Sequence, residues 1–267
     1  MAEGAAAHGA RAQLLGCPID PVGMEEAVAR CEAAIAAGEY LQQASVNAAK
    51  IVSMSGDPAL RAMVAESGLV TADGQSVVWA GRLLGVPLPE RVAGIDLMQQ
   101  LLALAARDGR RVYVLGARRE VLETALERLR AGYPGLTIAG ARDGYYGDAE
   151  VEQVCEEIRA ARADILFVAM SSPRKEHFLG AHGASLGVGF AMGVGGSIDV
   201  IAGVTRRAPR LLQRLGLEWA YRLAQEPRRL AGRYLRTNLR FGWMVLRALV
   251  SRRGSGGGAA GPAGPAA

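Results

Sequence analysis

Residues 111–116 read Arg-Val-Tyr-Val-Leu-Gly, and residues 164–170 read Asp-Ile-Leu-Phe-Val-Ala-Met. Both are short apolar runs, and a longer segment with helical spacing lies between them. The same alternation continues along the chain, which predicts further strands at 41–46, 69–72, 136–139 and 188–194. Strands that alternate with helices are typical of a mostly parallel sheet covered by helices on both faces. The sequence therefore predicts an α/β fold.

The composition excludes several classes of protein. The chain has 267 residues, of which 50% are hydrophobic and 21% are charged, so a large core is possible and general disorder is excluded. The three cysteines and three histidines are not at metal-ligand spacing, and we expect no metal, no cofactor and a reducing compartment. The first residues lack the pattern of a signal peptide, and no apolar run reaches the ~18 residues of a membrane-spanning helix.

Positive charge is concentrated near the C-terminus. Residues 205–253 hold thirteen arginines and two acids, Glu218 and Glu226, and carry a charge of +11, whereas the rest of the chain carries −6. This segment predicts an anionic partner, which is a nucleic acid, a phosphorylated ligand or a membrane surface. No nucleic-acid-binding motif is present, so we expect no nucleic acid. Arginines mixed with Trp, Phe and Leu over residues 239–250 are typical of a helix in a membrane interface, and the alternative is a solvated helix packed on the body.

These patterns divide the chain into four parts. We expect a disordered N-terminus at 1–12, an α/β domain carrying the catalytic site at 13–204, a basic helical membrane-associating appendage at 205–253 and a disordered Gly/Ala/Pro tail at 254–267.

Ligands of such sheets bind beyond the carboxyl ends of the strands, so the residues that follow each strand are candidates for a site. Asp73 follows one strand and is either part of an Asp-Gly turn or a general base. Asn47 follows another, either as a helix N-cap or as a contact for a sugar or phosphate. Arg91 enters a helix and is either a solvated arginine or a partner for diphosphate oxygens.

Three more segments at strand ends are open to two interpretations. Gly116 precedes a helix whose first N–H groups attract phosphate, although neither a dinucleotide nor a P-loop fingerprint is matched. Residues 171–176, with Ser172, Lys175 and Glu176, form either a Ser-Pro turn before a helix or a polar lip for substrate. Gly196 and Asp199 belong to a loop that is either simply flexible or approached by a ligand.

The order of these motifs is more specific than any one of them. From about Leu15 to Phe241 the chain resembles the WecG/TagA/CpsF family of bacterial glycosyltransferases. The motifs that carry the resemblance are Ser45-Val-Asn47, Ala72-Asp73-Gly74, Glu90-Arg-Val-Ala-Gly94, Val114-Leu-Gly116, Asp143-Gly-Tyr145, Ser172-Pro-Arg-Lys-Glu176, Gly195-Gly-Ser-Ile-Asp199, Arg207-Ala-Pro209 and Leu215-Gly-Leu-Glu-Trp219 through Glu226-Pro-Arg-Arg229.

The resemblance implies a Rossmann-like core and a metal-independent, inverting transferase. Such an enzyme moves a sugar from a UDP-sugar, typically UDP-N-acetylmannosamine, to a polyprenyl-diphosphate-linked sugar in cell-envelope polysaccharide synthesis. It implies a peripheral protein on the cytoplasmic face of the plasma membrane, with a possible homo-oligomer. The competing class is a nucleotide-binding oxidoreductase on the same framework, and a thermal shift with UDP or with NAD separates the two.

The resemblance also assigns roles to residues. The family's proposed base falls on Asp73, its Thr-x-Asn motif on Ser45 and Asn47, and its diphosphate-contacting arginine on Arg91. Its membrane and lipid-diphosphate arginines include Arg222, Arg229 and Arg233. Lys175 stands before Glu176 where the family has glutamine, so Lys175 either binds the donor diphosphate directly or marks a different donor sugar, such as a hexose without the acetamido group.

Overall fold

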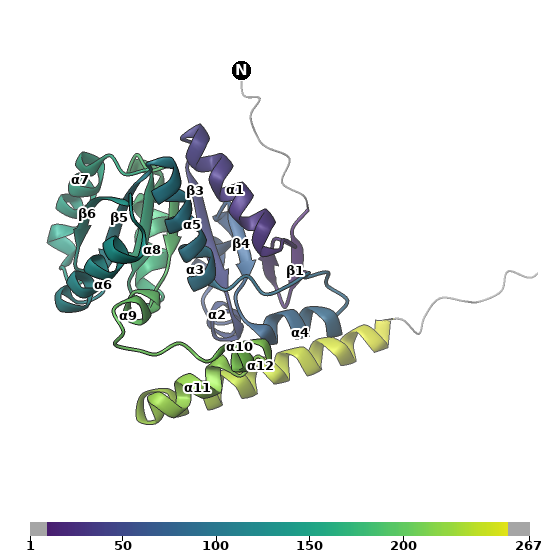
Figure 1. Ribbon diagram of the computed structural model, residues 1–267. Helices are drawn as coiled ribbons and strands as arrows, with labels where there is room; N and C mark the ends of the chain where they lie inside the picture. Colours follow the sequence, from purple (N-terminus) through teal and green to yellow (C-terminus); the bar gives the residue numbers. More distant parts are fainter. Residues whose placement is uncertain (1–9, 256–267) are drawn as a thin grey trace, which may run out of the picture.

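The computed structural model describes residues 10–255 and is built around one parallel sheet (Figure 1). The sheet has six strands in the order β4-β3-β8-β7-β5-β6. Their bounds are β3 (Leu41–Val46), β4 (Leu69–Ala72), β5 (Arg111–Gly116), β6 (Thr137–Arg142), β7 (Ile165–Ala169) and β8 (Phe190–Gly193). The predicted α/β architecture is confirmed.

Helices cover both faces of the sheet. One face packs against α1 (Met24–Ala37), α5 (Gly94–Asp108), α6 (Arg119–Gly132) and α9 (Ser197–Ile201). The other face packs against α2 (Ala48–Met54), α3 (Pro58–Glu66), α4 (Gln75–Leu83), α7 (Val151–Ala161) and α8 (Arg174–His182). In β7, Ile165 and Phe167 enter the first core whereas Leu166 and Val168 enter the second, which is why this strand is apolar at every position.

The structure adds a few elements. An antiparallel pair, β1 (Ala12–Leu14) and β2 (Cys17–Ile19), was not predicted, because three residues are too few to show a period. Helix α4 was also missed. A 3₁₀ turn, η1 (Asp148–Glu150), precedes α7. A second 3₁₀ turn, η2 (Gly183–Ser185), follows α8.

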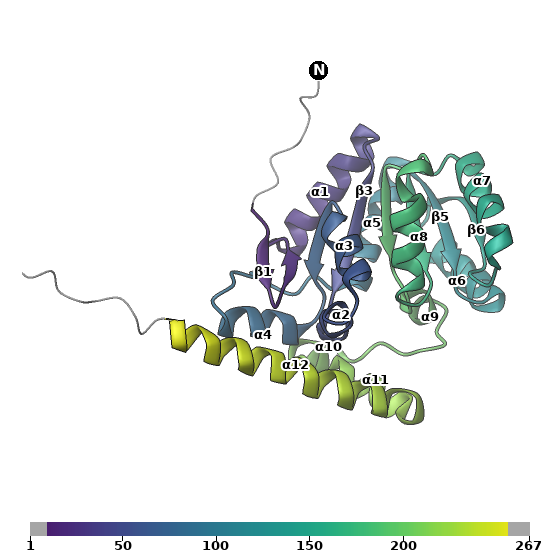
Figure 2. The same ribbon diagram turned by 180° about the vertical axis from the view of Figure 1, so that it is seen from behind.

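The C-terminal segment forms α10 (Arg210–Arg214), α11 (Glu218–Gln225) and α12 (Pro227–Ser255). These helices lie across the carboxyl ends of β3 and β4, with α12 running past α2 and α4 (Figures 1 and 2). Phe241 and Val245 of α12 are buried in the core that contains α2, α3 and α4. The segment is therefore packed on the body through one face of α12.

The two ends expected to be disordered lie largely outside the described residues. Within the described range, Ala12 already begins β1 and α12 extends to Ser255. No helix among residues 10–255 is both long and apolar enough to cross a membrane.

Asp20 ties the start of the chain to the sheet. Its side chain is fully buried, and Oδ2 accepts a hydrogen bond of 2.7 Å from the backbone N–H of Val70 in β4. Arg11 lies 3.3 Å and Arg30 lies 3.7 Å from the carboxylate. Arg11 also donates to the carbonyl oxygens of Ala65 and Ser67 at the C-terminal end of α3. One buried charge therefore joins β2, β4, α1 and α3.

Replacing Asp20 with alanine should lower the free energy of unfolding by about 2–3 kcal/mol, because it leaves the buried Val70 N–H without its acceptor and removes the carboxylate that Arg11 and Arg30 share. Urea unfolding followed by circular dichroism measures this change. Asp20→Asn keeps one acceptor oxygen and should cost less, and Glu26→Gln, which removes only an exposed i,i+4 pair with Arg30, should change stability by less than ~0.5 kcal/mol. Equal stability of the Asp20→Ala and Glu26→Gln variants would show that Asp20 is not an anchor.

Candidate active site

The backbone fixes Asp73 at the carboxyl edge of the sheet. Its N–H donates to the carbonyl of Val46 at the end of β3 (2.8 Å), and the N–H of Val92 donates to the carbonyl of Ala72 at the end of β4 (2.9 Å). These bonds place the loop before α5 beside the ends of both strands. Asp73 leads into α4, so the Asp-Gly pair starts a helix rather than a simple turn.

Gly94 brings the first turn of α5 against two predicted site residues. A Cβ atom at Gly94 would lie 3.0 Å from Ser45 Oγ and 3.5 Å from Asp73 Oδ2, which is close to the limit of packing. The backbone N–H of Gly94 acts on the Asp73 carboxyl group and lowers its pKa. The side-chain amide of Gln43 donates to Ser45 Oγ (3.2 Å) and to Thr71 Oγ1 (2.8 Å), and it thereby fixes the position of the Ser45 hydroxyl.

Arg91 is not a solvated surface arginine, which was one of its two interpretations from the sequence. Its Nη1 lies 2.9 Å from Oε2 of Glu218 in α11, and both side chains are about 15% exposed. Arg222, one turn further along α11, lies 3.8 Å from the other oxygen of Glu218. A second link is the bidentate pair of Arg207 with Asp96 in α5, at 2.6 and 2.7 Å. The C-terminal segment therefore contributes charges to the site.

The surroundings of Asp73 suit a general base. Burial raises the pKa of the Asp73 carboxyl, and the Glu218 carboxylate raises it further. Arg91, Arg222 and the Gly94 N–H act in the opposite direction, and burial outweighs them. A carboxylate with a raised pKa is a better proton acceptor at neutral pH than an ordinary aspartate.

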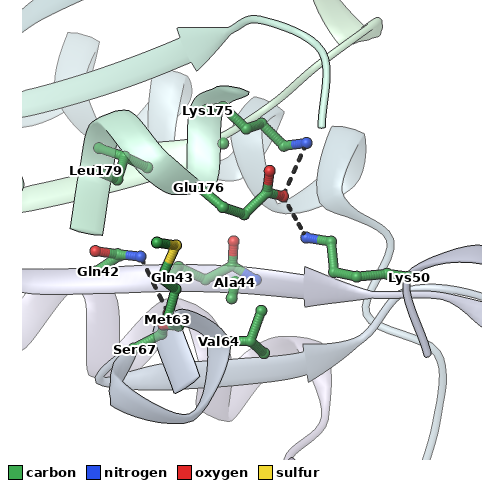
Figure 3. A pocket seen from close by; sticks show the side chains of 11 residues that line it. Gln42, Gln43, Ala44, Lys50, Met63, Val64, Ser67, Lys175, Glu176 and Leu179 are labelled. Carbon is green, nitrogen blue, oxygen red and sulfur yellow. Dashed lines mark hydrogen bonds and ion pairs between the residues drawn. The ribbon is translucent and has the colours of Figure 1, made fainter. Parts of the chain in front are cut away.

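A second charged cluster, formed by Lys50, Lys175 and Glu176, lies beside β3 (Figure 3). The sequence did not predict Lys50 as part of a site. Oε1 of Glu176 lies 2.9 Å from Nζ of Lys50 and 3.0 Å from Nζ of Lys175, and all three side chains are at least 88% buried. Oε2 of Glu176 is buried and has no hydrogen-bond partner among the residues that the structure describes. Lys50 follows the N-cap Asn47 by three positions, and nothing in its local sequence separates it from a surface lysine.

The cluster carries two positive charges and one negative charge beside a small cavity. The other residues that line this cavity are Gln42, Gln43, Ala44, Met63, Val64, Ser67, Leu179 and Gly193. Burial opposes ionisation of Glu176, but Lys50 and Lys175 outweigh it and lower the pKa to about 2. Burial, followed by the neighbouring Lys50, lowers the pKa of Lys175. Glu176 thus remains an anion, and burial disfavours the charged form of Lys175.

Both clusters surround the carboxyl end of β3. A Cβ at Gly193, the last residue of β8, would lie 2.8 Å from Cδ of Lys175, so this lysine crosses the end of β8. A Cβ at Gly74 would lie 3.5 Å from Cβ of Asn47. Asn47 also caps α2 by accepting from the Lys50 N–H (3.0 Å), which confirms the N-cap interpretation. The structure therefore brings Ser45, Asn47, Asp73 and Arg91 together at the ends of β3 and β4, and it places Lys175 and Glu176 beside β3 on the face that packs against α2, α3 and α8.

The structure does not place the remaining predicted site residues, apart from Arg222, beside Asp73. A Cβ at Gly116 would lie 2.7 Å from the carbonyl of Ala169, so close packing on β7 explains this glycine, and Ala169 already accepts the next N–H. Ser172 is exposed before α8. Gly196 and Asp199 lie at α9, which packs on α6 below the other half of the sheet (Figure 1). Arg222 reaches the site, whereas the side chains of Arg229 and Arg233 lie outside the described part of the structure.

No group of three or more His, Cys, Asp or Glu side chains that could hold a metal ion occurs within residues 10–255.

Comparison with known proteins identifies the family of the chain. The family model described as "Glycosyl transferase WecG/TagA/CpsF family" matches residues 12–255. A similar protein is the N-acetylglucosaminyldiphosphoundecaprenol N-acetyl-beta-D-mannosaminyltransferase of Bacillus spizizenii, which is 37% identical over 173 residues. The aligned part covers 65% of this chain and 66% of that relative, just under two thirds of its length.

The family match spans the whole α/β core together with α10, α11 and α12, and it includes the two charged clusters. The chain belongs to the glycosyl transferase WecG/TagA/CpsF family.

Proposed function

We propose that this protein is an inverting, metal-independent glycosyltransferase that moves a sugar from a UDP-sugar to a polyprenyl-diphosphate-linked sugar. The donor is UDP-N-acetylmannosamine or a related hexose, and the product serves cell-surface polysaccharide synthesis. The observation that carries the proposal is Asp73, a carboxyl group with a raised pKa at the carboxyl edge of the sheet, flanked by Arg91 and Arg222. The name of the similar Bacillus protein supports the substrate classes.

Asp73 acts as the general base in this proposal. It accepts the proton of the acceptor hydroxyl while that oxygen forms a bond to the anomeric carbon of the donor. The bond from the anomeric carbon to the diphosphate oxygen breaks, and UDP leaves with the electron pair. Attack from the face opposite UDP inverts the configuration at the anomeric carbon. Ser45 and Asn47, beside Asp73, are placed to contact the sugars.

Cationic side chains balance the charge of the leaving UDP. Arg91 presents a planar guanidinium that fits diphosphate oxygens, and Lys175 presents an ammonium group at the end of β8. When Lys175 turns toward a diphosphate, Lys50 still pairs with Glu176, so the buried carboxylate is not left alone. This exchange gives a physical reason for lysine where the family has glutamine.

The C-terminal segment supports binding to an anionic membrane. Five large apolar side chains of α12 are between 51% and 67% exposed, and they share one face of the helix: Leu235, Leu239, Trp243, Leu246 and Val250. We call them the α12 stripe. Arg236, Arg240 and Arg247 are exposed at positions that run along one side of it. This arrangement is typical of a helix in a membrane interface, and we place the protein at the cytoplasmic face of the plasma membrane.

The donor and acceptor are tested by offering a panel of UDP-sugars with a polyprenyl-diphosphate-linked N-acetylglucosamine and measuring released UDP. One or more N-acetylmannosamine-like or hexose donors should release UDP only when the acceptor is present. Absence of acceptor-dependent release with every donor would refute the proposed reaction.

Asp73→Asn should abolish transfer, with a loss of about 10²–10⁴-fold in kcat, because the amide cannot accept the hydroxyl proton. UDP affinity by calorimetry and the circular dichroism spectrum should remain those of the wild type, which separates catalysis from folding. Near-normal turnover by this variant would exclude Asp73 as the base.

Lys175→Gln should weaken UDP binding about 10-fold, because a charge-assisted contact with the diphosphate is replaced by a neutral one. The salt dependence of UDP affinity should also decrease. Lys50 keeps Glu176 paired, so the variant should fold. The matched control is Arg130→Gln, an exposed charge in the last turn of α6, which should bind UDP as the wild type does. Unchanged affinity of Lys175→Gln would contradict a diphosphate contact.

Arg240→Gln combined with Arg247→Gln should weaken binding to vesicles containing anionic lipid about 30-fold, since each arginine contributes ~1 kcal/mol at such a surface. The control pair Arg107→Gln and Arg130→Gln removes the same charge from the last turns of α5 and α6, at the amino edge of the sheet. Trp243→Ser should weaken binding to anionic and neutral vesicles alike. Sedimentation with vesicles measures both effects, and equal losses in the two arginine pairs would show that α12 is not the membrane surface.

A further inference from the structure

The site described above has two requirements that oppose each other. A departing diphosphate needs cations nearby, yet each cation beside Asp73 stabilises its ionised form and makes it a weaker base. Arg91 and Arg222 both act on Asp73 in this way. Something in the structure must therefore offset the two guanidinium groups without removing them.

Glu218 occupies the position that meets this need. It is the first residue of α11, its side chain is 16% exposed, and its two oxygens face different arginines. Oε2 lies 2.9 Å from Arg91 Nη1, and Oε1 lies 3.8 Å from Arg222 Nη2. One carboxylate thus connects an arginine of the loop before α5 with an arginine of the C-terminal segment.

We propose that Glu218 is a positioning residue of the Asp73 site, which holds Arg91 and Arg222 and balances their charge so that Asp73 remains able to accept a proton. This inference rests on the proposed function, in which Asp73 is the general base. Glu218 acts through other side chains and need not touch the substrate.

The other charges around Asp73 follow the same pattern. Arg207 lies in the chain between α9 and α10. The charge of Asp73 contributes to its raised pKa, but its hydrogen-bond partner is Asp96 of α5, in a bidentate pair. Three arginines therefore act on Asp73 or are acted on by it; Asp96 pairs with Arg207, and Glu218 is shared by Arg91 and Arg222 and offsets part of their charge. The Glu218 carboxylate and burial both raise the pKa of Asp73, against Arg91 and Arg222.

Pairing with Glu218 does not remove Arg91 from substrate binding. Glu218 contacts Arg91 through Nη1, and a guanidinium group carries five N–H donors in all. The remaining donors can meet a diphosphate while Nη1 stays on Glu218. A different role, in which Glu218 occupies the diphosphate position and inhibits the enzyme, predicts that its removal strengthens UDP binding and leaves Asp73 unchanged.

The test is the titration of Asp73 in the full-length protein, followed by NMR with ¹³C-labelled aspartate carboxyl groups and assigned with Asp73→Asn. Glu218→Gln keeps the shape of the side chain and an oxygen that accepts from Arg91, but removes the negative charge. Asp73 should then titrate about 1 pH unit lower, the size expected of one nearby charge. Glu226→Gln removes the same charge from the other acid of the segment and should leave Asp73 unchanged.

Arg222→Gln provides a second variant with the opposite sign. It removes a cation from the same network, so Asp73 should titrate at higher pH. An Asp73 titration that does not move in Glu218→Gln, or that moves equally in Glu226→Gln, overturns the proposal. Stronger UDP binding with an unmoved Asp73 also overturns it, in favour of the inhibitory role.

The pH profile of transfer tests the consequence for catalysis. The rate should rise with pH as Asp73 loses its proton, and in Glu218→Gln this rise should occur at lower pH. If the NMR titration of Asp73 shifts but no donor supports transfer, the proposed function is refuted and the role proposed for Glu218 is retained. Transfer with the same pH profile in wild type and Glu218→Gln would refute the charge balance and leave the proposed function standing.

Discussion

The ion pair between Arg91 and Glu218 joins two parts of the chain that are 127 residues apart. At 2.9 Å, and with both side chains about 15% exposed, it holds α11 against the loop that precedes α5. That loop also contacts the end of β4, where Asp73 lies. The basic segment is thereby a part of the site's electrostatics as well as a candidate membrane surface. The effect on Asp73 of Glu218 and Arg222, both on α11, depends on this contact.

The two clusters at the end of β3 differ in how their charge is balanced. In one, Lys50 and Lys175 share Glu176, and the pKa of the carboxyl falls to about 2. In the other, burial and Glu218 outweigh Arg91 and Arg222, and the pKa of Asp73 rises. The protein thus has one carboxyl group that is ionised at neutral pH beside two lysines and another whose pKa is raised. In the proposed reaction, the first environment suits a leaving diphosphate and the second suits an attacking hydroxyl.

Helix α12 has apolar residues on two faces, one buried and one exposed. Phe241 and Val245 are buried against the body, whereas the α12 stripe is exposed on the opposite side. Because its apolar residues occur on both faces, the segment does not show a single stripe, and its sequence alone left a packed helix and a membrane helix as alternatives. The structure buries Phe241 and Val245 against the body and leaves the α12 stripe exposed.

The sequence by itself determined the α/β fold and its strands, because the periodicity of apolar residues and a local cap such as Asn47 are properties of neighbouring residues. It also placed Ser45, Asp73 and Lys175 at strand ends. It did not identify Lys50 or the partner of Arg91, since neither depends on local pattern. Only the tertiary structure decided that Lys50 meets Glu176 and that Glu218 meets Arg91, because ion pairs between distant segments exist only when strand order and helix packing bring them together.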